Sequence, residues 1–169
     1  QCENLESVTI SNTVRNINDY AFQSCSKLSS VTFDSHSTLL NIGTHSFSRC
    51  SALQGITIPD SVNSFAGNSF YYSGLTIPSM VKNLGSATFS YCNSLATVSF
   101  TSGSEITSIG QWVFGNCTYL TSINIPESVT VIDSNAFNNC SALPSITIPA
   151  GVTNINYAAF QNCTSLATI

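Results

Sequence analysis

The chain has 169 residues, of which 43% are hydrophobic and only 7% are charged, against about 25% in an average soluble protein. Its 29 Ser, 18 Thr and 17 Asn residues supply most of the polar groups, and the net charge of −4 is spread without runs. This balance argues against a surface that follows phosphates, so neither nucleic acid nor an anionic membrane is an expected partner. No apolar run reaches the roughly 18 residues that a membrane span needs.

Apolar residues recur with a regular spacing through the whole chain. Each phenylalanine of one set follows apolar residues five and eight positions earlier, and all but one are followed three positions later by Cys. The members, 19 to 25 residues apart, are Phe22, Phe47, Phe70, Phe89, Phe114, Phe137 and Phe160. A unit this short cannot close a core alone, so neighbouring units must stack. The pattern predicts a repeat solenoid of about seven coils.

Each coil also carries a short segment of strand-forming residues. Examples are Val31-Thr32-Phe33, Ile56-Thr57-Ile58 and Ile146-Thr147-Ile148, and several such segments end at proline. Stacked in register, they predict a parallel β-sheet along one wall of the solenoid. The segment before each Phe-x-x-Cys fits either a second short strand or a single helical turn.

Differences in repeat length fall between the apolar positions. Two units carry two extra residues, at 34–38 and 101–105, and one unit is four residues short around 70–78. We expect the core stacking to continue through all three, with a local kink or narrowing at the short unit.

The unit C-x-x-L-x-x-[VI]-T-[IF]-P-x-x-V-x-x-I-x-x-x-A-F-x-x-C resembles the BspA-like, or Treponema-type, leucine-rich repeat. The stretch from Cys117 to Cys140 matches it closely, and the resemblance runs from Cys2 to Ile169. Departures are Ser73 in place of Cys, and Ser46, Ser69, Thr88 and Val113 in place of Ala. The resemblance implies a right-handed leucine-rich-repeat coil. We expect residues 1–169 to be one array, an excerpt of a longer array without caps of its own.

In that family, the arrays belong to surface proteins of oral bacteria and mucosal protists, and adhesion to host matrix proteins and cells is the usual role. The resemblance therefore implies an extracellular or cell-surface binding protein whose partner is a protein or a glycan. We expect neither enzyme activity nor a cofactor, because the catalytic residue types form no suitable cluster in the sequence.

The cysteines after each phenylalanine fall in one column along the solenoid axis. Their spacing does not exclude disulfides between adjacent coils, but a column of small buried thiols is the simpler interpretation. It lacks the paired clustering of a zinc site, so we expect no metal.

Titratable residues give little support to catalysis. Only His36 and His45 are of the residue type that usually serves as a general base near neutral pH. Asp34-Ser35-His36 lies in an insertion, where three adjacent side chains rarely converge. The eight acids show no repeated pairing suited to acid–base work.

Three sequons occupy one register of the repeat, at Asn116, Asn139 and Asn162. They are possible N-glycosylation sites if the protein is secreted by a eukaryote. The alternative is that asparagine before cysteine simply suits a tight turn.

Outward-facing positions of the strand segments predict a candidate ligand-binding surface, which we call the hydroxyl wall. It comprises Ser30, Thr32, Thr57, Thr97, Ser99, Ser122, Asn124, Ser145 and Thr147. Solenoids bind partners on such walls, although threonine also suits a solvated strand with no ligand. Candidate aromatic anchors near the turns are Tyr71, Tyr72, Tyr91, Trp112 and Tyr119.

Two other functions remain open at this stage. A bare solenoid end exposes strand edges and core residues, which would favour end-to-end stacking into a filament or surface coat. A regular threonine column also suggests ice binding, but unit lengths that vary between 19 and 25 residues disturb the flat lattice it requires.

Overall fold

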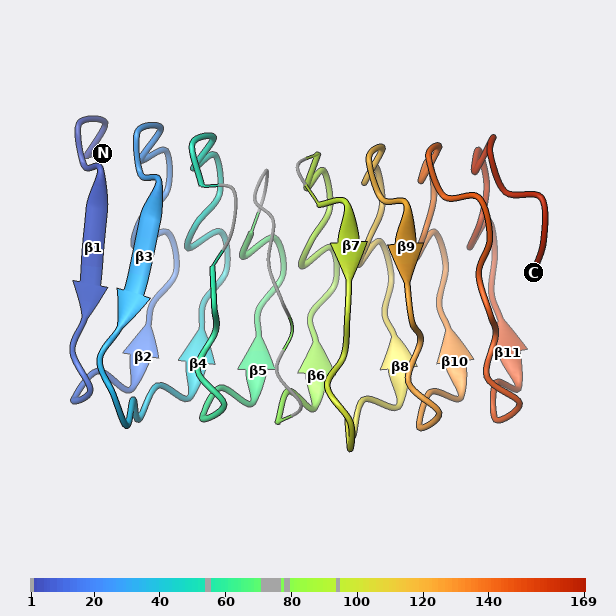
Figure 1. Cartoon of the computed structure of the whole chain (residues 1–169), viewed down its shortest axis with the longest axis horizontal. Helices are drawn as coiled ribbons and strands as arrows, with labels where there is room; N and C mark the ends of the chain where they lie inside the picture. Colours follow the sequence, from blue (N-terminus) through green and yellow to red (C-terminus); the bar gives the residue numbers. More distant parts are fainter. Residues whose placement is uncertain (1, 54–55, 71–76, 78–79, 94) are drawn as a thin grey trace.

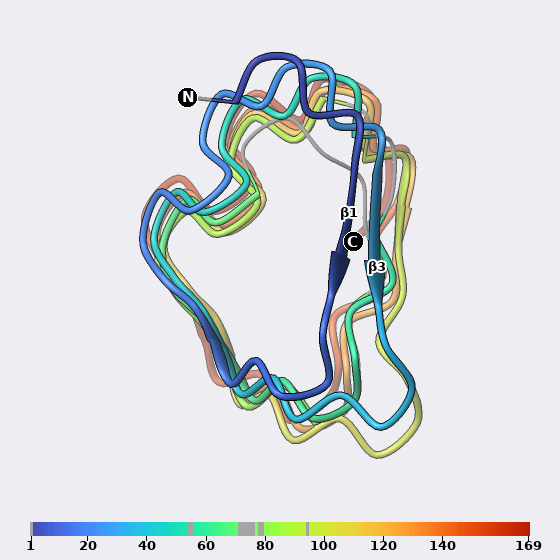
Figure 2. The same cartoon turned by 90° about the vertical axis from the view of Figure 1, so that its left-hand side faces the viewer.

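The computed structural model describes residues 2–53, 56–70, 77, 80–93 and 95–169. It is an elongated β-solenoid whose coils stack along one axis, with the chain ends near opposite ends of the stack (Figure 1). Seen along the axis, the coils superpose on one outline, and the two insertions at 34–38 and 101–105 stand out on the same side (Figure 2). The described chain contains strands, bridges and turns and no helix.

The first wall contains the predicted segments of strand-forming residues, such as Val31-Thr32-Phe33. Its strands are β1 (Ser7–Ile10), β3 (Ser30–Phe33), β7 (Thr97–Val98) and β9 (Ser122–Ile123). β1 pairs in parallel with β3, and β7 with β9, while Ile77–Phe100 and Ser145–Thr168 form single bridges. Parallel pairing along this wall is therefore confirmed, and among the described residues it takes the form of two short strand pairs and two single bridges.

The opposite wall settles the choice between strand and helical turn in favour of strands. Two-residue strands occur there as β2 (Asn16–Ile17), β4 (Asn41–Ile42), β5 (Ser64–Phe65), β6 (Asn83–Leu84), β8 (Ser108–Ile109), β10 (Val131–Ile132) and β11 (Asn154–Ile155). They form parallel sheets in the orders β2-β4-β5-β6 and β8-β10-β11. The inward residue of each pair is apolar, so this second wall covers the core.

The third side is built from the residues around each repeated phenylalanine, which we call the phenylalanine turns. The N–H of each phenylalanine donates to the carbonyl of the residue before the next one, from Phe22 to Ser46 (2.8 Å) through to Phe137 to Ala159 (2.8 Å). This bond is present at every step between adjacent coils, including Phe70 to Thr88 in the short unit (3.3 Å). The turns therefore form a backbone ladder along the described array although they contain no strand.

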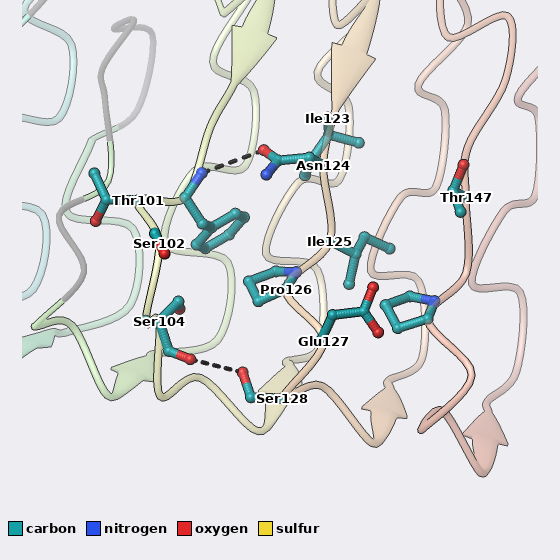
Figure 3. A pocket seen from close by; sticks show the side chains of 13 residues that line it. Thr101, Ser102, Ser104, Ile123, Asn124, Ile125, Pro126, Glu127, Ser128 and Thr147 are labelled. Atoms are coloured by element: carbon teal, nitrogen blue, oxygen red, sulfur yellow. Dashed lines mark hydrogen bonds between the residues drawn. The ribbon is translucent and has the colours of Figure 1, made fainter.

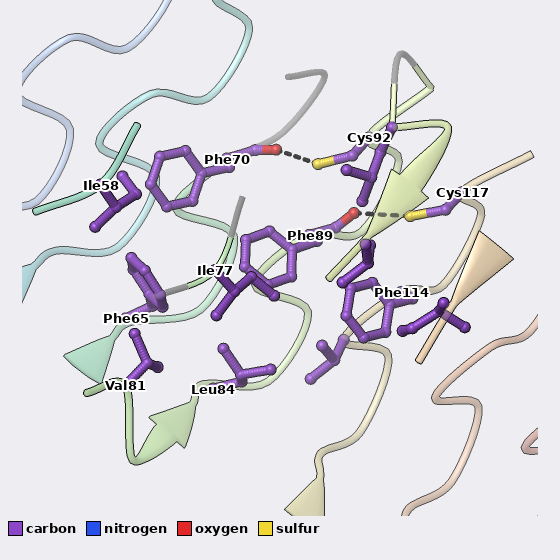
Figure 4. Close-up of a cluster of buried hydrophobic side chains, with 14 of the residues drawn as sticks. Ile58, Phe65, Phe70, Ile77, Val81, Leu84, Phe89, Cys92, Phe114 and Cys117 are labelled. Atoms are coloured by element: carbon purple, nitrogen blue, oxygen red, sulfur yellow. Dashed lines mark hydrogen bonds between the residues drawn. The ribbon is translucent and has the colours of Figure 1, made fainter. Parts of the chain in front are cut away.

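Inside the turns, the phenylalanine rings stack along the axis. Neighbouring rings lie 5.2–5.9 Å apart between centroids, and the five interior rings are fully buried. The widest step, 5.9 Å, joins Phe70 and Phe89 across the short unit, where Phe65 also packs edge-on (Figure 4). The predicted continuity of stacking is confirmed there, and the predicted kink at 70–78 falls mostly outside the described residues.

Cysteines fill the position beside the stacked rings and have a specific partner. The thiols of Cys50, Cys92, Cys117, Cys140 and Cys163 each donate to the carbonyl of the phenylalanine in the preceding coil (Figure 4). All seven cysteines are free, and five are buried as predicted. The expectation of burial is wrong for Cys2, which is exposed, and for Cys163, which is partly exposed because no coil covers its outer side in this structure.

Burial disfavours ionisation of the Cys50 and Cys117 thiols. Desolvation, and then the neighbouring Cys25, raises the pKa of Cys50 to about 12. Desolvation likewise raises the pKa of Cys117. The buried thiols are thus hydrogen-bond donors that pack as small apolar side chains, which is how a cysteine column stabilises the array.

Candidate ligand-binding wall and groove

The hydroxyl wall is exposed along its length. All nine predicted positions are exposed to solvent, whereas the alternating residues, such as Val31, Ile56, Val98 and Ile146, are buried. The alternation follows from the pleat, which directs successive side chains to opposite faces. The predicted orientation of these side chains is therefore confirmed, and their role in binding remains a prediction.

Asparagine replaces a hydroxyl residue at one position of the wall, and there the structure departs from a regular ladder. The N–H of Phe100 donates to the side-chain Oδ1 of Asn124 (3.3 Å), where a parallel ladder would use a backbone carbonyl. No backbone hydrogen bond joins residues 99–105 to 124–128, all of which the structure describes. Backbone pairing between β7 and β9 therefore stops after Val98 and Ile123.

A second interruption lies on the other side of the same coil. β9 pairs with β7, and no backbone hydrogen bond connects the described residues 122–128 to 143–149. Ser145 pairs instead with Thr168 in the following coil. We call this interruption the wall seam; it leaves β9 with one unpaired edge in the exposed wall.

A hollow of about 570 Å³ opens over the wall seam (Figure 3). The 101–104 loop forms one side, the stretch from Ile123 to Ser128 forms the floor, and Thr147 and Pro149 form the other side. Asn124 and Thr147 are the two members of the hydroxyl wall that line it. We call this hollow the insertion groove. Its polar lining is neutral except for one carboxylate, that of Glu127.

Hydrogen bonds hold the loop side of the insertion groove in place. The hydroxyl of Ser128 donates to the carbonyls of Ser104 (2.9 Å) and Ile106 (2.6 Å). At the end of the loop, Glu105 pairs with Lys82 of the preceding coil (2.8 Å). Gly103 takes a φ of +83°, a left-handed conformation that glycine adopts without steric cost. The groove is thus present before any ligand binds.

The predicted aromatic anchors do not gather at one place. Tyr91 and Tyr119 are exposed, with 41% and 66% of their surfaces accessible. Trp112 is half-buried because its ring lies against the backbone of its own coil at Gly115, where a Cβ would come within 2.4 Å of the ring. Tyr71 and Tyr72 lie outside the described residues. Tyr91, Trp112 and Tyr119 do not line the insertion groove.

The histidines occupy structural positions. His36 has a φ of 59° in the first insertion loop, at the place that Gly103 occupies in the second. His45 stacks on Tyr20 with ring centroids 5.3 Å apart. Within the described residues, no group of three His, Cys, Asp or Glu side chains is arranged to hold a metal ion, and no helix is long and apolar enough to cross a membrane.

The sequon asparagines lie in left-handed turns. Asn116, Asn139 and Asn162 have φ values of 61°, 62° and 61°, a region in which asparagine is enriched among non-glycine residues. The amide of Asn139 donates to Oδ1 of Asn116 (3.1 Å), whereas Asn162 is exposed. Turn conformation therefore accounts for the asparagines, and Asn162 is the most accessible candidate for a glycan.

Sequence reasoning missed the insertion groove. Its distinguishing residues are the 101–104 loop, Pro126, Glu127 and Pro149, none of which belongs to the outward columns of the wall. The signal that points to it was visible as the two extra residues at 101–105 and the asparagine in a column of hydroxyls. Neither feature alone indicates a hollow, because the loop and the asparagine become neighbours only when the coils stack.

Comparisons with known proteins agree with the repeat pattern. The family model described as the BspA type leucine rich repeat region matches residues 1–103 and 73–169, with six copies. No curated protein matches the chain.

Several solved structures share the architecture. A leucine-rich repeat protein of T. pallidum is 24% identical with a TM-score of 0.84, over 96% of this chain and 78% of that one. A leucine-rich repeat protein from Bacteroides ovatus is 23% identical with a TM-score of 0.76, over 98% of this chain and 48% of that one. The pneumococcal vaccine antigen PcpA is 23% identical with a TM-score of 0.57, over 96% of this chain and 49% of that one. The chain thus spans about half the length of two of these proteins.

Proposed function

Because the chain belongs to the BspA-type leucine-rich repeat family, we propose that it is a non-catalytic binding scaffold, at the cell surface or outside the cell, that recognises a protein or glycan of a host through the hydroxyl wall. The observation that carries the proposal is the exposure of all nine wall residues over a continuous buried core. The phenylalanine turns hold this wall in a fixed shape, and a preformed surface loses little conformational entropy on binding. The similarity to a vaccine antigen supports a location accessible from outside the cell.

Composition supports recognition through polar contacts. The wall presents hydroxyl and amide groups and no charged side chain, so its partners are expected to form neutral hydrogen bonds with it. A typical interface of this kind carries about one hydrogen bond per 100–200 Å², which the columns of Ser and Thr can supply.

A binding screen with a matched variant tests the proposal. The array is presented to host cells, matrix proteins and a glycan array, beside a variant with Thr57, Ser99 and Thr147 each replaced by Lys. We expect the wild type to bind at least one of these targets, and the variant to lose binding while its circular dichroism spectrum and unfolding midpoint are retained. A folded wild type that binds none of the targets would contradict the proposal.

A separate measurement distinguishes binding from self-assembly. Light scattering across a range of protein concentrations reports whether the array associates end to end.

Retained binding by the folded Lys variant would move the site away from the hydroxyl wall, to the turns that carry Trp112 and Tyr91.

A further inference from the structure

We propose that the insertion groove binds a basic side chain, arginine above all, presented by an extended segment of a protein partner. The inference rests on the proposed function and deepens it, since it selects protein rather than glycan as the partner class. Charge, shape and rigidity of the groove support it independently of one another.

Charge is the first argument. Glu127 is the single charged residue among the residues that line the groove, and its side chain is exposed. Lys82 of the preceding coil adds no positive charge to the lining, because it is not among the lining residues and is paired with Glu105. A carboxylate in a neutral hollow, on a chain of net charge −4, favours a cation.

The shape of the groove suits a long side chain. Pro126, which is half-buried, precedes Glu127 in the floor of the groove (Figure 3). Its ring offers apolar surface to the aliphatic stem of an arginine while the head of that side chain reaches the carboxylate. The planar guanidinium has five donors, enough to bond Glu127 and hydroxyls of the loop together. Phe100, the one aromatic residue of the lining, is 6% exposed and offers no ring for a sugar to stack on.

The floor of the groove explains why the side chain would belong to an extended polypeptide. β9 has an unpaired edge at the wall seam, and residues 124–128 form no backbone hydrogen bonds with either adjacent coil in this part of the described wall. Backbone N–H and C=O groups that are left unbonded in the floor of a groove are available to the main chain of a peptide lying in it. The loop side is already fixed by Ser128, so binding requires little reordering.

Titration of the isotope-labelled array with a short capped peptide, Ser-Gly-Ser-Arg-Ser-Gly-Ser, tests the inference by amide chemical shifts. The control peptide carries citrulline, a neutral isostere, in place of arginine. We expect the arginine peptide to shift the amides of residues 101–104 and 124–128 and the citrulline peptide to bind about fivefold more weakly, as loss of an exposed ion pair predicts. Added salt weakens the arginine peptide selectively.

Two variants assign the effect to one carboxylate. Glu127→Gln should reduce affinity for the arginine peptide about fivefold and abolish its preference over citrulline. Asp60→Asn is the matched control, because Asp60 is exposed and follows proline at the corresponding place beside the first insertion loop; it should leave affinity within twofold, on the order of experimental error. Equal binding of both peptides, unchanged binding by Glu127→Gln, or no shifts in the groove at millimolar peptide would each overturn the inference.

These outcomes are distinct from failure of the proposed function. An array that binds a host target through the hydroxyl wall, and keeps that binding in full after Glu127→Gln, would retain the proposed function and lose the groove assignment. An array that binds no host target would contradict the proposed function, whereas the peptide titration still decides whether the groove recognises arginine.

Discussion

The phenylalanine turns and the hydroxyl wall belong to the same coils but differ in how they connect one coil to the next. In the turns, the N–H of each repeated phenylalanine from Phe22 to Phe137 bonds to the next coil, and the rings stack at every step. In the wall, whose residues have far higher strand propensity, pairing among the described residues is confined to short segments. Continuity of this array therefore depends on packing in the turns more than on strand propensity in the wall.

The contrast has a structural cause. The spacing from each second-wall apolar residue to its phenylalanine is constant at five residues, while both insertions follow the first wall. Prolines end several wall segments and remove N–H groups from the ladder. The wall can thus vary in length and sequence while the turns keep the register between coils.

The largest expected effect comes from removing a ring from the turns. Phe137 is fully buried between Phe114 and Phe160, with centroids 5.4 and 5.2 Å away. Phe137→Ala should lower the free energy of unfolding by about 3–5 kcal/mol because of the cavity it leaves. Thr147→Lys in the same coil should change it by no more than about 0.5 kcal/mol. Denaturant titrations measure both values, and equal losses of unfolding free energy in the two variants would contradict the prediction.

Alkaline pH should weaken the turns through their thiols. The folded state keeps the Cys50 proton up to about pH 12, whereas the thiol's ordinary pKa is 9.0, so unfolding releases a proton between these values. Stability should fall as the pH rises from 9 towards 12, by at most about 1.4 kcal/mol per pH unit for this thiol. Below pH 9 the full contribution is present.

Replacing the thiol sharpens that test. Cys50→Ser should reduce the slope of stability against pH in the alkaline range, because a serine hydroxyl does not titrate there. Cys2→Ser should keep the wild-type slope, because Cys2 is exposed and outside the buried column. Urea unfolding at stepped pH values measures both. Identical slopes in all three proteins would show that the column thiols ionise with the same ease in the folded and unfolded chain.

Two serines at the same register of the turns should respond in opposite directions. The hydroxyl of Ser46 is buried without a hydrogen-bond partner, whereas that of Ser69 donates to the carbonyl of Gly43 (3.1 Å). Ser46→Ala should stabilise the protein by about 1 kcal/mol, and Ser69→Ala should destabilise it by about 1 kcal/mol. Thermal unfolding of both variants measures the difference, and a loss of stability in Ser46→Ala would indicate a missing partner.

The smallest expected effect concerns the ion pair between the two sheets of the second wall. β6 and β8 belong to different sheets, and the exposed pair of Lys82 and Glu105 connects their coils. The pair raises the pKa of Lys82 and lowers that of Glu105, so what it contributes is present above the ordinary pKa of Glu and below that of Lys. Because both side chains are exposed, Lys82→Gln should leave stability unchanged within error in physiological salt. A clear loss of stability would mean that the ion pair helps to hold the two sheets together.

The repeat pattern was sufficient to predict the solenoid, the inward and outward columns, and the buried thiols, because each follows from which residues recur at one register. It was not sufficient for the extent of pairing in the wall. That depends on where the Asn124 side chain takes the place of a backbone acceptor, which is a matter of three-dimensional contact. The insertion groove escaped prediction for the same reason: Glu127 and the 101–104 loop are separated in sequence and lie together only after the coils stack.

The two insertion loops also determine a distance along the array. They precede the second and fifth repeated phenylalanines in the sequence and project on one side (Figure 2). Three coil rises at the usual inter-strand spacing amount to about 14 Å. Because the array grows or shrinks by whole coils, that distance changes in steps of about 4.8 Å. A relative that gains or loses one coil between the loops would therefore present the same two projections at a different, quantised separation, and a partner that spans both would distinguish the two proteins by length alone.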